Sequence, residues 1–460
     1  MVKVRAANRS ATGISTVLWS AAIALSACGG GGRGGDDPAA APAPPPAPSA
    51  YEAARIPVRG DDTPCESSTS TCALFDAVFV NEAGVATLFW EEDPTGKPAW
   101  HVAAHRPGEP AVSERVFVSE PLGHRQIVPL DSHRFAVLTL SNDLSEWVSN
   151  VVDSSTATPT VSPQTRTSLA GHIYPALIAS EGRLYAVATG ISARSYPLDG
   201  SGTAAQGVLA KLPPDWGHTG AAATSVMPSA WWAYIAGQPS VPGYSVQLSR
   251  LDFESGTLTP PEARSTGELP HPGELTIGEH AIGQVTVGWL EHSDDGSRNV
   301  RVDGQRLNAA GTVGKAGPVL GGSQAGPVVA WEEGAAGENT AWGQRLVWQH
   351  KDLRTGAWSL AAPLSSSPKV RTLALAAGPR GTMAIAWTGC TETGWDCASH
   401  VSRFVDGAWH TTQFTDVYWA AIEARVAINS KGEGVVAWLG QAVCPSNPKA
   451  LCDRLSIHRF

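Results

Sequence analysis

The chain has 460 residues, of which 42% are hydrophobic and 16% are charged. This length allows a large core, built either as one domain of repeats or as several ordinary domains. Its 33 basic and 42 acidic residues give a net charge of −9, which repels phosphate backbones and argues against a nucleic-acid partner. The many Gly (48), Pro (34) and Trp (17) residues favour short elements joined by turns.

The first 28 residues have the three parts of an export signal. A positive segment comes first, formed by Lys3, Arg5 and Arg9. The apolar run 14–25 that follows is too short to span a bilayer. The run ends in LSAC, which resembles the lipobox of bacterial lipoproteins. The resemblance implies cleavage after residue 27, lipidation of Cys28 and, with Gly29 next in a Gram-negative source, an outer-membrane address. An ordinary secretory signal with an incidental cysteine is the alternative.

A stretch rich in Gly, Ala and Pro follows the cysteine. It has no apolar periodicity and cannot bury a core. We expect its Gly part to be flexible and its Ala-Pro part to be semi-rigid polyproline II. The sequence therefore divides into a signal peptide (1–27), a lipidated cysteine with its tether (28–50) and a folded domain (51–460).

The chain has seven cysteines, and setting Cys28 aside leaves three local pairs. The pairs are Cys65/Cys72, Cys390/Cys397 and Cys444/Cys452. Because an exported chain meets an oxidising compartment, we predict three disulfides. Zinc is the alternative, but the loops contain no CxxC and no His, which does not match a zinc knuckle.

From residue 70 onward, one phrase returns: a turn rich in Gly, Pro, Asn or Ser, then a β-run that ends in Trp. Its clear copies are NEAGVATLFW, AIGQVTVGW, AGPVVAW, GPRGTMAIAW and SKGEGVVAW. With three weaker copies, the anchor residues are Trp90, Leu138, Ala188, Tyr234, Trp289, Trp331, Trp387 and Trp438, at intervals of 42 to 56 residues. Each interval has room for four strands, which predicts an all-β chain folded as one β-propeller of eight four-stranded blades. Seven blades are the alternative count, and tandem β-sandwiches are the alternative fold.

The two ends of the folded domain predict how the ring closes. Residues 454–460 (RLSIHRF) have the pattern of the third strand of a last blade, with no fourth strand after them. The segment 55–58 (RIPV) could supply that fourth strand and remove an open sheet edge. The anchor Trp side chains are expected to form the core between blades.

Arg55-Ile56-Pro57 also resembles part of the F/Y-R-I-P signature of sialidases, which are propellers whose arginine from this motif grips a substrate carboxylate. Here Ala54 takes the place of the aromatic residue, and no Asp-box follows. The resemblance implies a glycan-acting hydrolase, provided that Arg55 faces a central pocket. A position for Arg55 on an outermost strand would remove this hypothesis.

The loop after each second strand and the link between blades open on the same end of a propeller. Acidic and aromatic residues recur in the segments that follow the anchor Trp. The candidate ligand-face residues are Glu91, Glu92, Glu291, Glu332, Glu333, Trp342 and Trp395. They predict a polar, cation-friendly binding face with two stacking groups. Ordinary solvated loops, with disulfides serving only stability, are the alternative.

The sequence contains no HExxH, GxSxG or Walker motif. His101 and His105 would share one side of a strand, but two histidines alone define no metal site. The segment 352–358 (DLRTGAW) resembles one repeat of quinoprotein-like propellers, which supports the fold and implies no cofactor. We therefore predict no catalytic residue, no cofactor and no metal.

The sequence favours a non-enzymatic, lipid-anchored extracytoplasmic propeller in the cell envelope. Its expected role is a binding or scaffold module for a protein or glycan partner. The alternatives are a sialidase-like hydrolase and a purely structural envelope protein.

Overall fold

The computed structural model describes the following residues, and every structural statement below concerns them alone. They are 51–57, 73–92, 99–109, 113–118, 125–140, 146–168, 176–180, 183–188, 192–197, 206–210, 221–226, 229–237, 243–252, 259–265, 271–281, 284–293, 297–323, 325–336, 343–365, 367–378, 381–392, 397–414, 421–444, 447 and 451–460.

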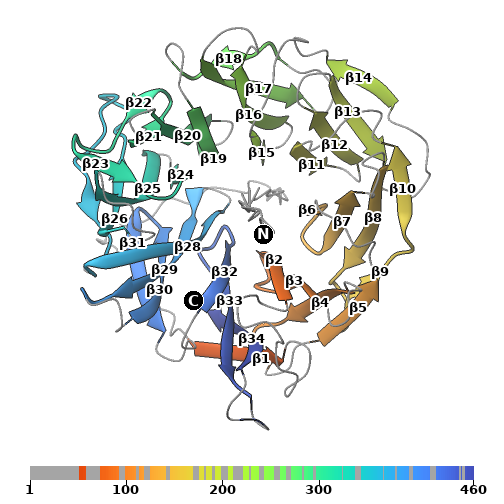
Figure 1. The fold of residues 1–460 in the computed structure, drawn as a ribbon. Helices are drawn as coiled ribbons and strands as arrows, with labels where there is room; N and C mark the ends of the chain where they lie inside the picture. Colours follow the sequence, from red (N-terminus) through yellow and green to blue (C-terminus); the bar gives the residue numbers. More distant parts are fainter. Residues whose placement is uncertain are drawn as a thin grey trace, which may run out of the picture.

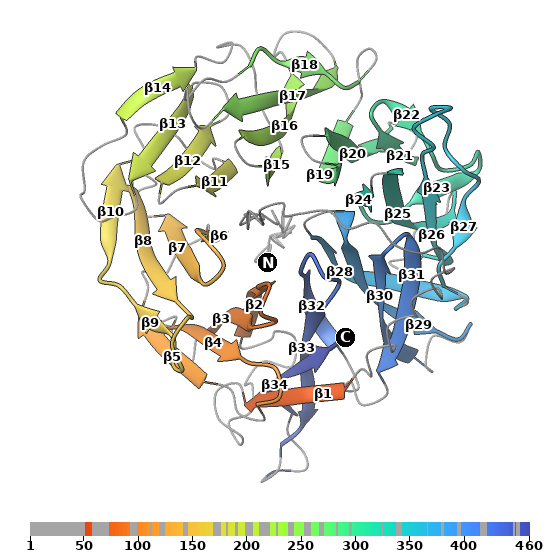
Figure 2. The same ribbon diagram turned by 180° about the vertical axis from the view of Figure 1, so that it is seen from behind.

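Eight antiparallel sheets follow one another around a ring (Figure 1), and the view from behind shows the same closed arrangement (Figure 2). We number them as blades 1 to 8 in chain order. Blade 1 contains β2 (Ala73–Val80), β3 (Ala86–Glu92), β4 (Ala99–His105) and β5 (Ser113–Val118). Blade 2 contains β6 (Arg125–Pro129), β7 (Arg134–Leu140), β8 (Glu146–Asp153), β9 (Thr160–Val161) and β10 (Thr165–Ser168). Blade 3 contains β11 (Ala176–Ser180), β12 (Arg183–Ala188), β13 (Ser192–Pro197) and β14 (Gln206–Ala210).

Blade 4 contains β15 (Ala221–Val226), β16 (Ser229–Gly237), β17 (Tyr244–Asp252) and β18 (Glu262–Ala263). Blade 5 contains β19 (His271–Ala281), β20 (Gln284–His292), β21 (Arg298–Val302) and β22 (Gln305–Arg306). Blade 6 contains β23 (Thr312–Gly314), β24 (Val319–Ser323), β25 (Gly326–Ala335), β26 (Arg345–His350) and β27 (Ala362–Pro363). Blade 7 contains β28 (Lys369–Ala377), β29 (Met383–Cys390), β30 (Cys397–Val405) and β31 (Ala408–Phe414). Blade 8 contains β32 (Ala421–Ile428), β33 (Gly434–Val443), β34 (Leu451–Arg459) and, from the other end of the domain, β1 (Tyr51–Pro57).

The predicted all-β propeller is confirmed, and the described sheets number eight rather than seven. All eight anchor residues named from the sequence lie on the second strand of their blade. The repeated phrase is therefore the first hairpin of each blade, with its turn and its inward-packing strand.

The core of the ring lies between blades, where each anchor Trp packs on the preceding blade. Trp289 of blade 5 packs with Val246 and Leu248 of blade 4. Trp438 of blade 8 likewise joins Ala386 and Val401 of blade 7. Trp90, Trp289, Trp331 and Trp438 are at most 1% exposed. A large, flat side chain at this position buries the sheet face that a single blade leaves uncovered.

The antiparallel order of strands gives the ring two distinct ends. The turn end, as we call it, carries the turn between the first and second strands of a blade and the turn between the third and fourth. The loop end carries the loop between the second and third strands and the link to the next blade. Residues 81–85 and 351–358 lie at the turn end, and residues 391–392 and 444 at the loop end.

The last blade is completed by the N-terminal strand. β1 is the outermost strand of blade 8 and pairs antiparallel with β34, from Tyr51 opposite Arg459 to Pro57 opposite Arg454. Arg459 donates a hydrogen bond to the carbonyl oxygen of Gly84 in the first turn of blade 1, so it lies at the turn end. Since Tyr51 lies opposite Arg459, β1 begins at the turn end.

Candidate functional site

Most of the acidic side chains assigned to the loop end are buried. Glu92, Glu291, Glu332 and Glu333 are between 2% and 6% exposed, and Glu91 is half-buried. Their predicted placement in exposed loops is wrong, because β3, β20 and β25 continue past their Trp and carry these residues within the sheet. Side chains alternate along a strand, so the second residue after each Trp shares its buried face. Trp342 and Trp395 lie outside the described residues.

In blade 5, the carboxylate of Glu291 is held by a guanidinium. Arg301 donates from Nε to Oε2 at 2.9 Å and from Nη2 to Oε1 at 3.0 Å. Asn299 donates a longer bond of 3.4 Å to Oε1. The side chain of Glu291 is 4% exposed and that of Arg301 is 27% exposed. This two-bond geometry neutralises a charge that burial alone would make costly.

Blade 6 repeats the arrangement with different neighbours. Glu333 accepts hydrogen bonds from Arg345 Nε at 2.8 Å and from Thr312 Oγ1 at 2.6 Å. A third contact joins Arg345 Nη2 to the same carboxylate at 2.8 Å. The two blades thus close their loop ends with the same chemistry, so these acids hold the sheet together rather than face solvent.

Blade 1 replaces the arginine with a histidine. Trp90 donates its indole N–H to Glu92 Oε1 at 2.8 Å, and His101 Nε2 lies 3.6 Å from Glu92 Oε2. The imidazole stacks on the Trp90 ring with a centroid separation of 5.1 Å. His101 is therefore part of the packing between blades 8 and 1.

Sequence reasoning missed the basic partners of these acids. A usable signal was present: Trp-x-Glu recurs in three blades, and an arginine follows the glutamate after 10 residues in blade 5 and after 12 in blade 6. That interval is one hairpin, which brings the arginine back beside the carboxylate.

Two of the three predicted cysteine pairs lie among the described residues, and both are at the loop end. Cys444 and Cys452 form a disulfide with a Cα–Cα distance of 5.1 Å. Cys390 is disulfide-bonded, and the register of β29 and β30 places Cys397 opposite it. Cys28, Cys65 and Cys72 lie outside the described residues.

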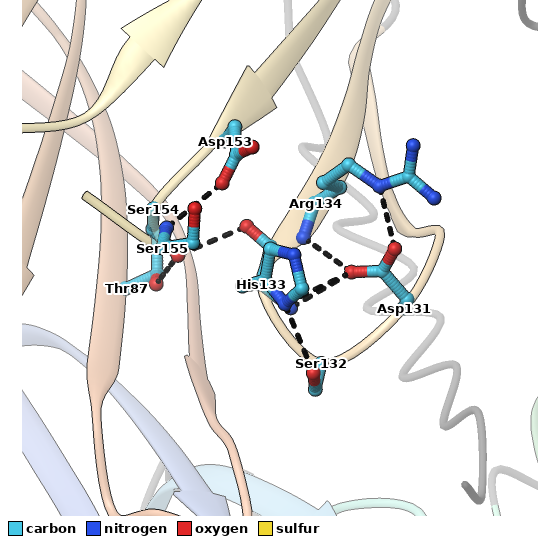
Figure 3. Close-up of polar contacts among 8 residues, drawn as sticks. All are labelled: Thr87, Asp131, Ser132, His133, Arg134, Asp153, Ser154 and Ser155. Carbon is cyan, nitrogen blue, oxygen red and sulfur yellow. Dashed lines mark hydrogen bonds and ion pairs between the residues drawn. The ribbon is translucent and has the colours of Figure 1, made fainter.

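The turn end contains a polar network between blades 1 and 2 (Figure 3). The hydroxyl of Ser154 accepts a hydrogen bond from Thr87 at 3.0 Å and donates one to the carbonyl oxygen of His133 at 3.0 Å. Arg106 donates to the carbonyl oxygens of Ser154, Thr156 and Ala157 on the neighbouring blade. The network therefore joins one blade to the next through backbone acceptors.

Asp131 organises the first turn of blade 2. Its Oδ1 accepts from the backbone N–H groups of His133 at 3.0 Å and Arg134 at 2.8 Å, and its Oδ2 pairs with Arg134 Nε at 2.5 Å (Figure 3). Burial raises the pKa of Asp131, but these hydrogen bonds outweigh it and hold the pKa below 3.8. The pKa of Asp153 is lowered in the same way, because bonds from Ser155 exceed the effect of burial.

The same turn brings Asp, Ser and His together without the geometry of a catalytic triad. Ser132 Oγ lies 3.1 Å from His133 Nδ1, and Asp131 Oδ1 lies 3.5 Å from that same nitrogen (Figure 3). A nucleophilic triad needs the hydroxyl at one ring nitrogen and the carboxylate at the other. This cluster therefore shapes a turn and does not activate Ser132.

His105 joins the last strand of the ring to the first blade. Its Nε2–H donates to the carbonyl oxygen of Glu109 at 2.9 Å, which leaves Nδ1 as an acceptor for Arg459 Nη2 at 3.0 Å. Arg459 also donates to the carbonyl oxygen of His105 at 2.7 Å. Burial and the adjacent guanidinium lower the pKa of His105 from 6.5. The imidazole is 1% exposed and neutral in this arrangement.

The two histidines of HVAAH do not meet at a common centre, since His101 packs on Trp90 and His105 binds Arg459. Within the described ranges, no three side chains of His, Cys, Asp or Glu gather in a way that could hold a metal ion. In the same part of the chain, no helical segment is long and apolar enough to cross a membrane.

No protein-family model and no curated protein matches this chain. Among solved structures, it is similar to a puromycin-hydrolyzing peptidase of Mycobacterium tuberculosis, with a TM-score of 0.43 and 14% identity over 80% of this chain and 58% of that one. It is also similar to the polysaccharide lyase Uly1, with a TM-score of 0.41, 10% identity and coverage of 89% and 96%. The β-propeller domain of the Trilobed protease from Pyrococcus furiosus gives a TM-score of 0.38, 8% identity and coverage of 84% and 94%. Likenesses of this size carry no argument about function.

Proposed function

We propose that this chain is a lipid-anchored, extracytoplasmic β-propeller lipoprotein, carried by an outer membrane, that binds a protein or glycan partner through its loop end. The observation that carries the proposal is the pairing of cysteines in adjacent blades at that end. Disulfides persist in an oxidising compartment, in agreement with the export signal and lipobox of the first 28 residues.

A disulfide that closes a loop also prepares it for binding. The Cys444–Cys452 bridge joins the ends of β33 and β34 and encloses the loop between them. A loop ordered in advance loses less conformational entropy when a partner binds. In the first turns of blades 1, 2 and 8, at the turn end, polar side chains instead accept hydrogen bonds from the backbone of the same turn.

The sialidase-like alternative does not survive the position of Arg55. This residue lies on β1, the outermost strand of blade 8, opposite Ser456 of β34. The innermost strands of the blades, which surround the ring centre, are the ones that could present a side chain to a central pocket (Figure 1). The hydrolase hypothesis is therefore withdrawn, and a purely structural envelope protein remains the alternative role.

The anchor is tested with Cys28→Ser in the full-length chain expressed in a Gram-negative host. We expect loss of acyl labelling and accumulation of an uncleaved precursor, while the folded domain keeps its disulfides. Normal acyl labelling of this variant would refute the lipoprotein assignment.

The binding role is tested with a photo-crosslinking amino acid at exposed Glu392, in the blade 7 loop. The matched control is exposed Ala408, at the turn end of the same blade. We expect a discrete adduct of protein or glycan from position 392 in intact cells and none from position 408. Failure at 392 and at further loop-end positions would favour the structural role.

A further inference from the structure

A short hairpin at the turn end of blade 6 exposes apolar side chains to solvent. Among the described residues, the large hydrophobic side chains that are exposed are Val116 (49%), Leu353 (48%) and Leu360 (91%). The two leucines belong to one segment, the turn between β26 and β27 that includes DLRTGAW. We call residues 351–360 the blade 6 hairpin.

The hairpin continues the sheet beyond the end of β26. Lys351 forms a bridge with Trp358, and the backbone N–H of Asp352 donates to the carbonyl oxygen of Ala357 at 3.0 Å. Asp352 Oδ1 accepts from Arg354 N at 2.7 Å, which fixes the tip as an Asx turn. The two exposed leucines therefore belong to a hairpin whose backbone is fixed by hydrogen bonds.

Its polar groups are those of a membrane-interface segment. Lys351 Nζ lies 5.9 Å from the centroid of the half-buried Trp358 ring, and Arg354 is exposed. Trp358 packs against the core cluster that contains Leu290 and Trp331, so the two leucines are the large apolar side chains of the hairpin that face solvent. Leucine flanked by lysine and arginine suits the boundary between acyl chains and anionic headgroups, about 5–10 Å deep. The carboxylate of Asp352 is turned back onto the backbone of the hairpin.

The direction of β1 puts the tether at this same end. Tyr51 lies opposite Arg459, whose guanidinium contacts Gly84 in a turn-end hairpin. The chain therefore enters the ring at the turn end, where Tyr51 begins the outermost strand of blade 8. A lipid carried by Cys28 would tether the ring from this end, which favours an orientation with the turn end toward the bilayer and the loop end away from it.

From these observations we infer that the turn end faces the membrane and that the blade 6 hairpin inserts Leu353 and Leu360 into the lipid surface. The inference rests on the proposed lipid anchor. It deepens the proposed function, because a partner bound at the loop end would then be met on the aqueous side of the envelope.

The test uses the full-length, lipidated chain in vesicles of phosphatidylethanolamine and phosphatidylglycerol, with an environment-sensitive fluorescent amino acid at Thr355. The control probe replaces Glu392 at the loop end. Both positions are exposed, and neither is one of the two leucines. We expect brominated lipids to quench the probe at 355 at least about twofold more than the probe at 392, as interfacial insertion requires.

A second arm separates insertion from mere proximity. Leu353→Ser with Leu360→Ser should reduce the quenching at 355 by at least about half, because the apolar contact is lost. Val116→Ser, an equally polar change at an exposed residue of β5, should leave it unchanged. Equal reduction by both changes would overturn the hairpin contact.

Co-sedimentation with the vesicles distinguishes failure of the proposed lipid anchor from failure of the inferred orientation. Protein that sediments with lipid but shows no excess quenching at 355 keeps the anchor and overturns the inferred orientation. Protein that does not sediment overturns the anchor and the inference with it.

Discussion

The two ends of this propeller are held together by different chemistry. At the turn end, short turns satisfy their own backbone through Asn and Asp side chains, and glycines let neighbouring blades approach closely. At the loop end, buried carboxylates are paired with arginine, and disulfides join the strand ends. The conformation of the first turn of a blade is thus set by residues close in sequence, whereas the loop-end carboxylates depend on partners one hairpin away.

The largest effect is expected at the turn end. Gly381 has a φ of +81°, and a Cβ there would lie 1.6 Å from the carbonyl oxygen of Gly322 in the preceding blade. Gly381→Ala should cost about 1–2 kcal/mol for the left-handed backbone and about 1–3 kcal/mol more for the clash. Urea unfolding would measure the loss.

Gly407 supplies the control for that substitution. It has nearly the same φ, +80°, in the other turn of blade 7, and a Cβ there would meet nothing within 4 Å. Gly407→Ala should lose only the backbone part, about 1–2 kcal/mol. Equal losses at 381 and 407 would show that the close approach between blades 6 and 7 carries no energy.

At the loop end, Arg301→Ala should be the most damaging change, because it leaves Glu291 buried without its guanidinium. Removal of one partner from a buried pair costs about 3–5 kcal/mol, and the partial exposure of Arg301 favours the lower value. Adding Glu291→Gln should restore part of the stability by removing the charge. Arg298→Ala, an exposed arginine on the same strand, should change stability by less than about 0.5 kcal/mol.

Loss of the Cys444–Cys452 bridge should come next. For a separation of 8 residues, loop-closure entropy gives about 2–3 kcal/mol. Replacing both cysteines with alanine should lower the unfolding midpoint and should allow protease cleavage between 444 and 452. A variant as stable as the oxidised parent would show that this bridge does not contribute to the free energy of unfolding.

The same contrast explains which parts of the molecule the sequence predicts. Gly84, Gly381 and Gly432 precede their anchor Trp by six residues because each takes the left-handed position of the first turn, with φ between +75° and +81°. A local requirement of this kind repeats in the sequence, and it located the second strand in blades 1, 7 and 8.

The loop end lacks such a local rule, which is why its acids were misplaced. Nothing in Trp-Glu-Glu says whether a strand stops at Trp90 or continues to Glu92. The answer depends on cross-strand partners such as His101, whose position is fixed only once the hairpin forms. The exposed Leu353 and Leu360 were also passed over, since exposure is a property of the assembled ring.

The smallest expected effect is a pH dependence at the turn end, where the last strand meets the first blade. The pKa of His105 is lower in the folded chain than its unfolded value of 6.5. Between those two pKa values the unfolded chain binds more protons, so the contribution of His105 is complete above pH 6.5 and declines as the pH falls. Protonation at Nδ1 would place a positive charge against the guanidinium of Arg459.

His105→Gln isolates this contribution, because glutamine can accept from Arg459 and donate to Glu109 but does not titrate. His280 and His400 also have lowered pKa values through burial, so the parent chain should lose stability on acidification for several reasons. The informative quantity is the difference between parent and variant in unfolding free energy at pH 7.5 and pH 5.5, which bracket the unfolded pKa of about 6.5. A smaller loss in the variant would place part of the acid sensitivity at the ring closure, and identical losses would remove His105 from it.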